Sequence, residues 1–514
     1  MNLLSSATLF SFFTLISRIL GYLRDILIAI FLGASIFADA FFVAFRLPNT
    51  FRRLFAEGTF NAAFIPSYAS AKLSNKQQGK KFADDIFNFL ILILLFLVTL
   101  VEIFTPYLVY IIAPGFVDSG LKFEIAVELT RITFPFLLFV SLSSFFSGIL
   151  NSNNKFAAAA AAPIILNIVL ITSLVTSFYF DLDYAKQLSY GVTFAGVLQL
   201  IFLIYFSLQY YKPNFSFNFK ITKKVKFFFK KLLPSVLSSG VTQINILIGT
   251  IIASFQAGAV SYLYYADRVY QINLAIAGIA VGTVSLPVLS RAFKSKNINK
   301  VSKIQNNSFE LSLLLSIPAS FGLVIASEEI VSGLFGYGSF SKEDTLLTAA
   351  ALKYFGYGVP AFALIKVLSN FFFARDNTKS PFYISLFIVV INVLISISLF
   401  SRVGFLIIPI ATSISTWLGV FVYLYLLEQK SCLLLKIELL KNSFKIMIST
   451  VIMSFILVFT LDTFSNSLKY INNYKAVYLI SIISFVGFIY LLSCYLLGIL
   501  NFKKYKINRW IRKN

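Results

Sequence analysis

Histidine is absent from this chain of 514 residues, and cysteine occurs only twice, at Cys432 and Cys494. Without imidazole the chain has no histidine acid–base catalysis, no Ser/His/Asp or Cys/His triad and none of the usual zinc sites. The cysteines lie in apolar stretches without CxxC spacing, so no disulfide scaffold or redox motif is expected. No phosphate-loop motif is present either. These absences predict that the protein is not an enzyme and needs no organic cofactor.

Charge is also scarce, since only 13% of the residues are Asp, Glu, Lys or Arg, while 58% are hydrophobic. Soluble domains carry about 25% charged residues, and the mean hydropathy of +0.84 indicates a lipid environment. A spanning helix needs about 20 apolar residues. The sequence therefore predicts an all-α integral membrane protein with fourteen spans, near 7–32, 36–56, 84–112, 125–149, 157–179, 188–210, 232–255, 260–288, 308–333, 346–372, 381–400, 404–427, 442–464 and 475–500.

The basic residues of the predicted loops are unevenly distributed between the two sides. With fourteen spans, one side carries 28 Lys and Arg and the other carries six. Positive residues favour the cytoplasm, so both termini are expected there. The net charge of +23 then reflects topology and attraction to the phospholipid bilayer, and nucleic acid is not an expected partner.

A half-length internal repeat divides the predicted spans. Residues 135–167 align without a gap on residues 360–392, with matching prolines, polar turns and a final asparagine. Each half holds six spans, so the repeats are parallel and two lobes are expected to face a central cavity, as in transporters. The predicted domains are an N-terminal lobe at 1–211, a basic cytoplasmic linker at 212–230, a C-terminal lobe at 231–429, and two extra helices with a basic tail at 430–514.

Several arginines fall inside predicted spans, where a charge costs about 2.5–3.5 kcal/mol at the bilayer centre. Such residues should face protein or water. Guanidinium groups bind phosphate bidentately and stay ionised when they are desolvated, so an anionic, phosphorylated cargo is the hypothesis. The proposed cargo-binding residues are Arg18, Arg24, Arg52, Arg53 and Arg268, and the proposed gating or ion-pairing acids are Asp25, Asp39, Glu57 and Asp267.

Structural alternatives remain for part of this set. Arg52 and Arg53 are equally compatible with snorkelling to the cytoplasmic interface. Asp267 and Arg268 are also compatible with a structural ion pair. Arg131, which is not in the set, is assigned to a helix end.

Four segments of the sequence are distinctive: SRILGYLRD at 17–25, ADAFFVAFRLPN at 38–49, RRLFAEG at 52–58 and YYADR at 264–268. Together they resemble the MurJ (MviN) family of lipid II flippases, within the superfamily of multidrug, oligosaccharidyl-lipid and polysaccharide exporters. The resemblance implies a bacterial inner-membrane protein that carries lipid-linked peptidoglycan precursor to the periplasmic leaflet. It also implies functional importance for most of the charged residues named above, and a groove for the undecaprenyl tail in the last two spans.

The resemblance further implies coupling to the membrane potential or to an ion, sodium or a proton. Asp376 and Asn392 are the polar candidates for a sodium site in the second lobe. Cell-wall synthesis proteins are possible partners under the same resemblance.

A mechanism and three alternatives follow. Arg18, Arg24 and Arg268 would clamp the diphosphate, and Asp25, Asp39 and Glu57 would pair with the arginines after release. A cation-coupled drug exporter of the same superfamily would need acids in place of these arginines. A polysaccharide-lipid flippase would share the anionic chemistry, and a membrane scaffold would tolerate the loss of the arginines.

Overall fold

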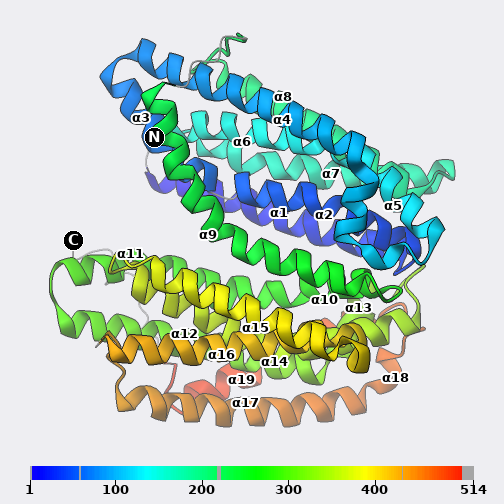
Figure 1. Ribbon diagram of the computed structural model, residues 1–514. Coiled ribbons are helices and arrows are strands. Elements are labelled where there is room, and N and C mark those ends of the chain that lie inside the picture. Colours follow the sequence, from blue (N-terminus) through cyan, green and yellow to red (C-terminus); the bar gives the residue numbers. More distant parts are fainter. Residues whose placement is uncertain (1–2, 57–58, 217–221, 431, 501–514) are drawn as a thin grey trace. The chain divides into compact units, whose positions relative to one another are not determined.

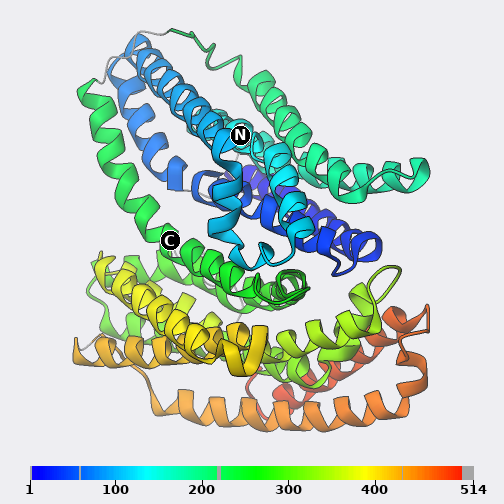
Figure 2. The same cartoon turned by 45° about the vertical axis from the view of Figure 1, so that its right-hand side comes forward.

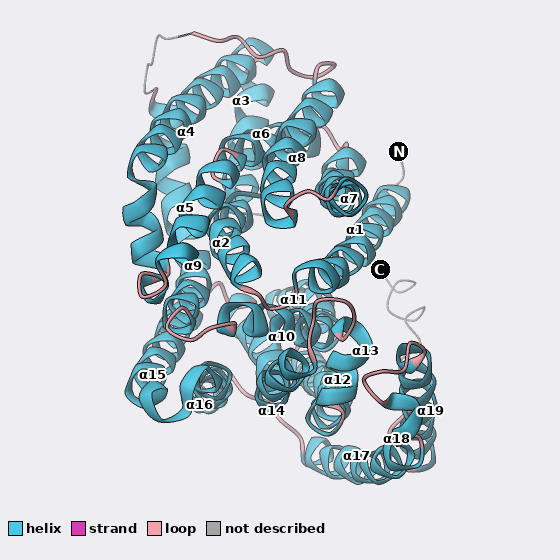
Figure 3. Ribbon diagram, turned by 90° about the vertical axis from the view of Figure 1, so that its right-hand side faces the viewer, coloured by secondary structure: helices cyan, strands magenta, loops and turns pink. Residues whose placement is uncertain are grey.

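The computed structural model describes residues 3–56, 59–216, 222–430 and 432–500, and every regular element in these ranges is a helix (Figure 3). The predicted all-α class is therefore confirmed. Contacts divide the chain into two compact units. Unit 1 comprises Met1–Ser261 with Gly338–Phe340, and unit 2 comprises Tyr262–Tyr337 with Ser341–Asn514.

Unit 1 is built on pairs of adjacent helices, in which α1 packs on α7, α2 on α5 and α6, and α8 on α6 and α7 (Figure 1). Side-chain caps mark several helix starts. For example, Asp183 accepts a hydrogen bond from the backbone N–H of Lys186. The helices are α1 (Leu3–Leu32), α2 (Ile36–Ala56), α3 (Thr59–Ser74), α4 (Lys76–Ile112), η1 (Pro114–Phe116), α5 (Gly120–Thr133), α6 (Phe136–Ser152), α7 (Phe156–Phe180), α8 (Tyr184–Ser207) and α9 (Lys223–Ala253).

Helix α9 belongs by its contacts to unit 1, although the repeat assigns it to the C-terminal lobe. It packs against α2, α3 and α4. Its Phe228 is fully buried and meets the rings of Phe60 and Phe64 edge-on. Part of the predicted linker at 212–230 is thus helical, because aromatic residues among its lysines have an apolar core to enter. The lobe boundary drawn from the repeat stays a prediction.

Unit 2 contains the remaining helices, of which α12 packs on α14 and α17, α14 on α16, and α17 on α19. Figure 2 shows α17 and α19 side by side, in orange and red. The elements are α10 (Ala259–Leu274, whose first turn belongs to unit 1), η2 (Ala275–Ala280, a π-helix), α11 (Val281–Lys294), α12 (Ile298–Ile325), α13 (Ser327–Phe335), α14 (Lys342–Phe373), α15 (Lys379–Val403), η3 (Gly404–Leu406), α16 (Ile407–Gln429), α17 (Ile437–Thr463), α18 (Ser465–Leu468) and α19 (Lys475–Leu496).

Ten helical stretches of the described chain are long and apolar enough to cross a membrane. One of them, Lys379–Gln429, contains both α15 and α16. Helices also occur at the predicted spans 7–32 and 36–56, where charged residues lower the apolarity, and at 232–255, where Gln243–Ala253 is found as a shorter apolar helix. A multi-pass helical protein is confirmed, and the count of fourteen stays a prediction.

The two units hold an inter-helix connector in the same way. In unit 1, Asn88 of α4 donates to the carbonyl of Asn214 (3.0 Å) and accepts from the N–H of Ser216 (3.2 Å). In unit 2, Asn306 of α12 donates to the carbonyl of Leu434 (2.7 Å) and accepts from the N–H of Lys436 (2.9 Å). Asn88 lies in the predicted span at 84–112, and Asn306 lies two residues before the predicted span at 308–333. Each is the third span of its half, so the matching contacts support the internal repeat.

Candidate functional site

A buried charged cluster joins α1 to α7 in unit 1. Arg24 donates through Nε and Nη2 to Oδ1 of Asp25, at 3.0 and 2.7 Å, and through Nη1 to Oδ1 of Asn167 at 2.9 Å. Asn167 in turn donates to the backbone carbonyl of Ser17 at 2.8 Å. Arg24 is 7% exposed and Asp25 is 2% exposed. The cluster therefore holds a desolvated guanidinium in a fixed orientation.

The composition of this cluster suits reversible anion binding. One partner of Arg24 is charged and one is neutral, and hydrogen bonds to ionised groups are the stronger kind. Phosphate oxygens and a carboxylate present the same acceptor geometry to a guanidinium. Asn167 was noted in the sequence only as a repeat marker. Its role as partner of Arg24 becomes visible only when α7 is placed against α1.

Arg18 does not join this cluster through any contact found in the structure. Its side chain is exposed on α1, beside the exposed apolar residues Leu15 and Ile19. Six residues separate Arg18 from Arg24, which is about 9 Å along a helix and a different helix face. The two arginines of α1 therefore have different environments.

Asp39 lies in a second buried centre and is fully inaccessible. Its carboxylate pairs with the ammonium of Lys122 at 2.5 Å. It also accepts hydrogen bonds from the N–H of Gly258 (3.0 Å) and from the N–H and hydroxyl of Ser261 (2.9 and 2.6 Å). In the sequence, Asp39, Arg46 and Arg53 recur at intervals of seven residues, which predicts one polar stripe along this helix, and Lys122 falls in a predicted loop. The structure gives Asp39 three partners outside that stripe.

The predicted stripe on α2 is accordingly not one connected network. Asp39 and Arg53 are 14 residues apart, or about 21 Å along the helix axis. Arg52 is partly buried and its Nε donates to Oδ1 of Asn49 at 3.0 Å. Arg53 is partly buried as well. Glu57 lies outside the described residues.

In unit 2, the predicted residues Asp267 and Arg268 lie on α10. The Arg268 guanidinium covers the ring of Tyr264 at 4.7 Å and donates to its hydroxyl at 3.0 Å. Asp267 accepts a short hydrogen bond from the side chain of Gln271. Tyr264 of the same helix thus holds the Arg268 guanidinium through a cation–π contact and a hydrogen bond.

The candidate sodium residues are not brought together. Asp376 is exposed in the turn between α14 and α15 and has a positive φ of 58°. Asn392 is buried on α15, where it donates to the hydroxyl of Thr412 at 3.3 Å. The helix rise between Lys379 and Asn392 is about 20 Å. A coupling ion in the second lobe stays a prediction.

Comparison with known proteins identifies the family of this chain. The family model described as "Lipid II flippase MurJ" matches residues 28–479. The chain belongs to the MurJ family. A protein of Rhizobium tropici named "Probable lipid II flippase MurJ" is 40% identical over 452 residues, covering 87% of this chain and 85% of that protein. A protein of the same name from Buchnera aphidicola subsp. Schizaphis graminum is 35% identical over 514 residues, covering 97% and 98%.

Solved structures agree with the MurJ assignment. A structure described as "Lipid II flippase MurJ, inward closed conformation" has a TM-score of 0.82 and 28% identity, covering 98% of this chain and all of that chain. An inward-facing multidrug resistance MATE family transporter has a TM-score of 0.66 at 15% identity, covering 80% and 94%, which shows a shared fold. MurJ is a family of membrane transporters and not a family of catalytic enzymes.

Proposed function

We propose that this protein moves lipid II, the undecaprenyl-diphosphate-linked disaccharide-peptide, from the cytoplasmic to the periplasmic leaflet of the bacterial inner membrane. Membership of the MurJ family supports lipid II as the substrate. The observation in the chain itself is the buried Arg24, which is held by Asp25 and Asn167. The protein performs no bond chemistry, and both termini face the cytoplasm.

The mechanism follows from the cost of moving a diphosphate through hydrocarbon. An unpaired buried charge costs many kcal/mol, so the head group needs a cavity that supplies positive charge while the lipid tail stays in the bilayer. Arg24 binds the diphosphate by exchanging Asp25 for phosphate oxygens. Asn167 keeps its bond to Nη1 and preserves the orientation of the guanidinium during this exchange. Asp25 pairs with Arg24 again after release.

The remaining arginines complete the proposed cargo site. Arg18 is accessible on α1, and Arg268 presents a guanidinium braced by Tyr264. Binding of a dianionic group neutralises these cations and favours the alternating-access step that carries the head group across the membrane. A membrane potential negative inside favours return of an emptied cationic site toward the cytoplasm, by about 2.3 kcal/mol per charge per 100 mV.

The test uses a strain in which this chain is the sole lipid II flippase. Lipid II reaching the outer leaflet is measured with a leaflet-specific label, beside the amount of protein inserted in the membrane. We expect Arg24→Ala to reduce delivery at least tenfold and Arg24→Lys to reduce it less, because Lys keeps the charge but loses the bidentate geometry. Arg402→Ala, at an exposed position of α15, is the matched control and should leave delivery unchanged.

Two results would contradict the proposal. Delivery at the unmodified rate with Arg24→Ala would remove Arg24 from the mechanism. Outer-leaflet lipid II that persists after depletion of the protein itself would reject the substrate. Accumulation of a different polyprenyl-linked saccharide on depletion would favour a polysaccharide-lipid flippase.

A further inference from the structure

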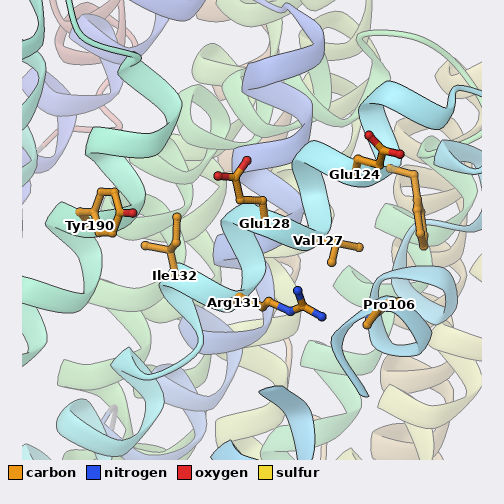
Figure 4. Close-up of a pocket in the computed structure, with 8 residues that line it drawn as sticks. Pro106, Glu124, Val127, Glu128, Arg131, Ile132 and Tyr190 are labelled. Atoms are coloured by element: carbon orange, nitrogen blue, oxygen red, sulfur yellow. The ribbon is translucent and has the colours of Figure 1, made fainter. Parts of the chain in front are cut away.

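A pocket of about 520 Å³ lies in unit 1, apart from every residue discussed for lipid II. Figure 4 shows Glu124, Glu128 and Arg131 projecting from α5, with Tyr190 of α8 and Pro106 of α4 on opposite sides of the pocket. Three neighbouring helices of one lobe thus build the site.

The pocket exists because α4 bends beside it. Phe104 has non-helical backbone angles, two residues before Pro106. Proline has no N–H to donate to the carbonyl of Glu102, and the hydroxyl of Thr105 donates to that carbonyl instead, at 3.1 Å. The bend turns this part of α4 away from the straight helix path and leaves space in front of α5.

The surface around the pocket is one that lipid covers. Large apolar side chains are exposed on each helix, including Ile103 and Tyr107 of α4, Leu121 of α5 and Phe194 of α8. The stretch Gly120–Ser152, which contains α5, is a candidate membrane span. The pocket therefore opens toward the bilayer, and its ligand should have an apolar part that lies along these side chains.

Two of the three charged side chains that line the pocket form no ion pair with another described residue. Glu124 and Arg131 are exposed and have no ion-pair or hydrogen-bond partner in the described part of the chain. Glu128 pairs with Lys186 at 2.8 Å, but both side chains remain about half exposed. Arg131 lies in the last turn of α5, as assigned from the sequence, and lines the pocket within the candidate span Gly120–Ser152. An exposed guanidinium on a lipid-facing surface requires an anionic partner.

A carboxylate of α4, that of Glu102, lies near the pocket. Glu102 lies within electrostatic range of Arg131. Its Oε1 atom is buried and has no hydrogen-bond partner among the described residues. The pocket thus has an exposed guanidinium and an exposed carboxylate, Glu124, and the buried Oε1 atom of Glu102 near it has no hydrogen-bond donor among the described residues.

We propose that this pocket binds the head group of a zwitterionic phospholipid with a primary ammonium, of the ethanolamine type. The phosphate accepts from Arg131, which is long enough to reach toward the interface, and the ammonium donates to Glu124. The acyl chains lie along the exposed apolar residues of α4 and α8. The carboxylates oppose a polyanionic head group, and a quaternary ammonium has no N–H to offer them.

The test uses the full chain in nanodiscs of phosphatidylcholine that contain a small fraction of a photoreactive phospholipid. Crosslinked peptides are identified by mass spectrometry. We expect the phosphatidylethanolamine probe to label the 120–133 region at least fivefold more than phosphatidylcholine or phosphatidylglycerol probes of the same chain composition. Glu124→Gln should reduce this labelling at least fivefold, whereas the matched control Glu343→Gln, at an exposed position of α14, should not.

Three results would overturn the proposal. Equal labelling by the choline probe would show that the site does not distinguish a primary ammonium from a quaternary one. Stronger labelling by the glycerol probe would show an anionic-lipid site governed by Arg131 alone. If Glu124→Gln left the labelling unchanged, the Glu124 carboxylate would not be part of the binding site. The measurement does not involve lipid II, so its outcome is independent of the proposed function.

Discussion

Replacement of Asp39 by asparagine should destabilise unit 1 strongly. Asparagine has nearly the same shape but no charge, so the Lys122 ammonium, which is 5% exposed, loses its counter-ion. One amide oxygen can still accept from Ser261, but the amide nitrogen cannot accept from the Gly258 N–H. Breaking a buried ion pair by removing one partner costs about 3–5 kcal/mol. We expect a loss of that size.

The double variant Asp39→Asn/Lys122→Met tests the cause of this loss. Removal of both charges leaves only the unmet hydrogen bond, so the expected cost falls to about 1–2 kcal/mol. Adding Lys122→Met to Asp39→Asn should therefore restore about 2–3 kcal/mol of stability. The assay is equilibrium unfolding in mixed micelles with increasing sodium dodecyl sulfate, followed by circular dichroism at 222 nm.

The matched control is Asp183→Asn. Asp183 is an exposed helix cap whose acceptor oxygen survives the substitution, so its expected effect is within about 0.5 kcal/mol. The reasoning is refuted if Asp39→Asn unfolds within about 1 kcal/mol of the unmodified protein, or if Lys122→Met gives no recovery. Lipid II delivery by the double variant separates two roles. Recovery of transport would make Asp39 a structural anchor, and a stable but inactive protein would support the predicted gating role.

Further outcomes concern the backbone contacts of buried polar side chains. Asn88→Ala and Asn306→Ala each remove two side-chain hydrogen bonds to a connector, so each should cost about 1–3 kcal/mol. Each should also increase proteolysis of that connector in detergent. Asn88→Asp removes the amide donor alone and should be cleaved as readily as Asn88→Ala. Lys475 is 2% exposed and donates to the carbonyls of Gly336 and Tyr470 at 2.5 and 2.6 Å. Lys475→Met should cost about 3–6 kcal/mol, since hydrogen bonds to charged groups are worth about 1.5–3 kcal/mol each. Unchanged unfolding midpoints would contradict this account.

The membrane class was readable from the sequence because it depends on composition over about 20 consecutive residues, which needs no knowledge of neighbours. The same holds for the family, since the SRILGYLRD and YYADR segments are contiguous. The predicted helix at 475–500 corresponds to α19, and the predicted span at 157–179 corresponds to α7. Span counting was least secure where charged residues interrupt apolar helices, as in α1 and α2.

The tertiary structure decided which partner each buried charged side chain has. A spacing of seven residues puts Arg18 and Asp25 on one helix face. Asp25 nevertheless binds the guanidinium of Arg24, whose other partner is 143 residues away. Asp39 was placed on a stripe of arginines, but the packing of α2 on α5 gives it Lys122. Periodicity within one helix states which side chains share a face. Only the packing of helices distant in sequence states what that face meets, because that choice depends on side-chain shape and charge across the interface.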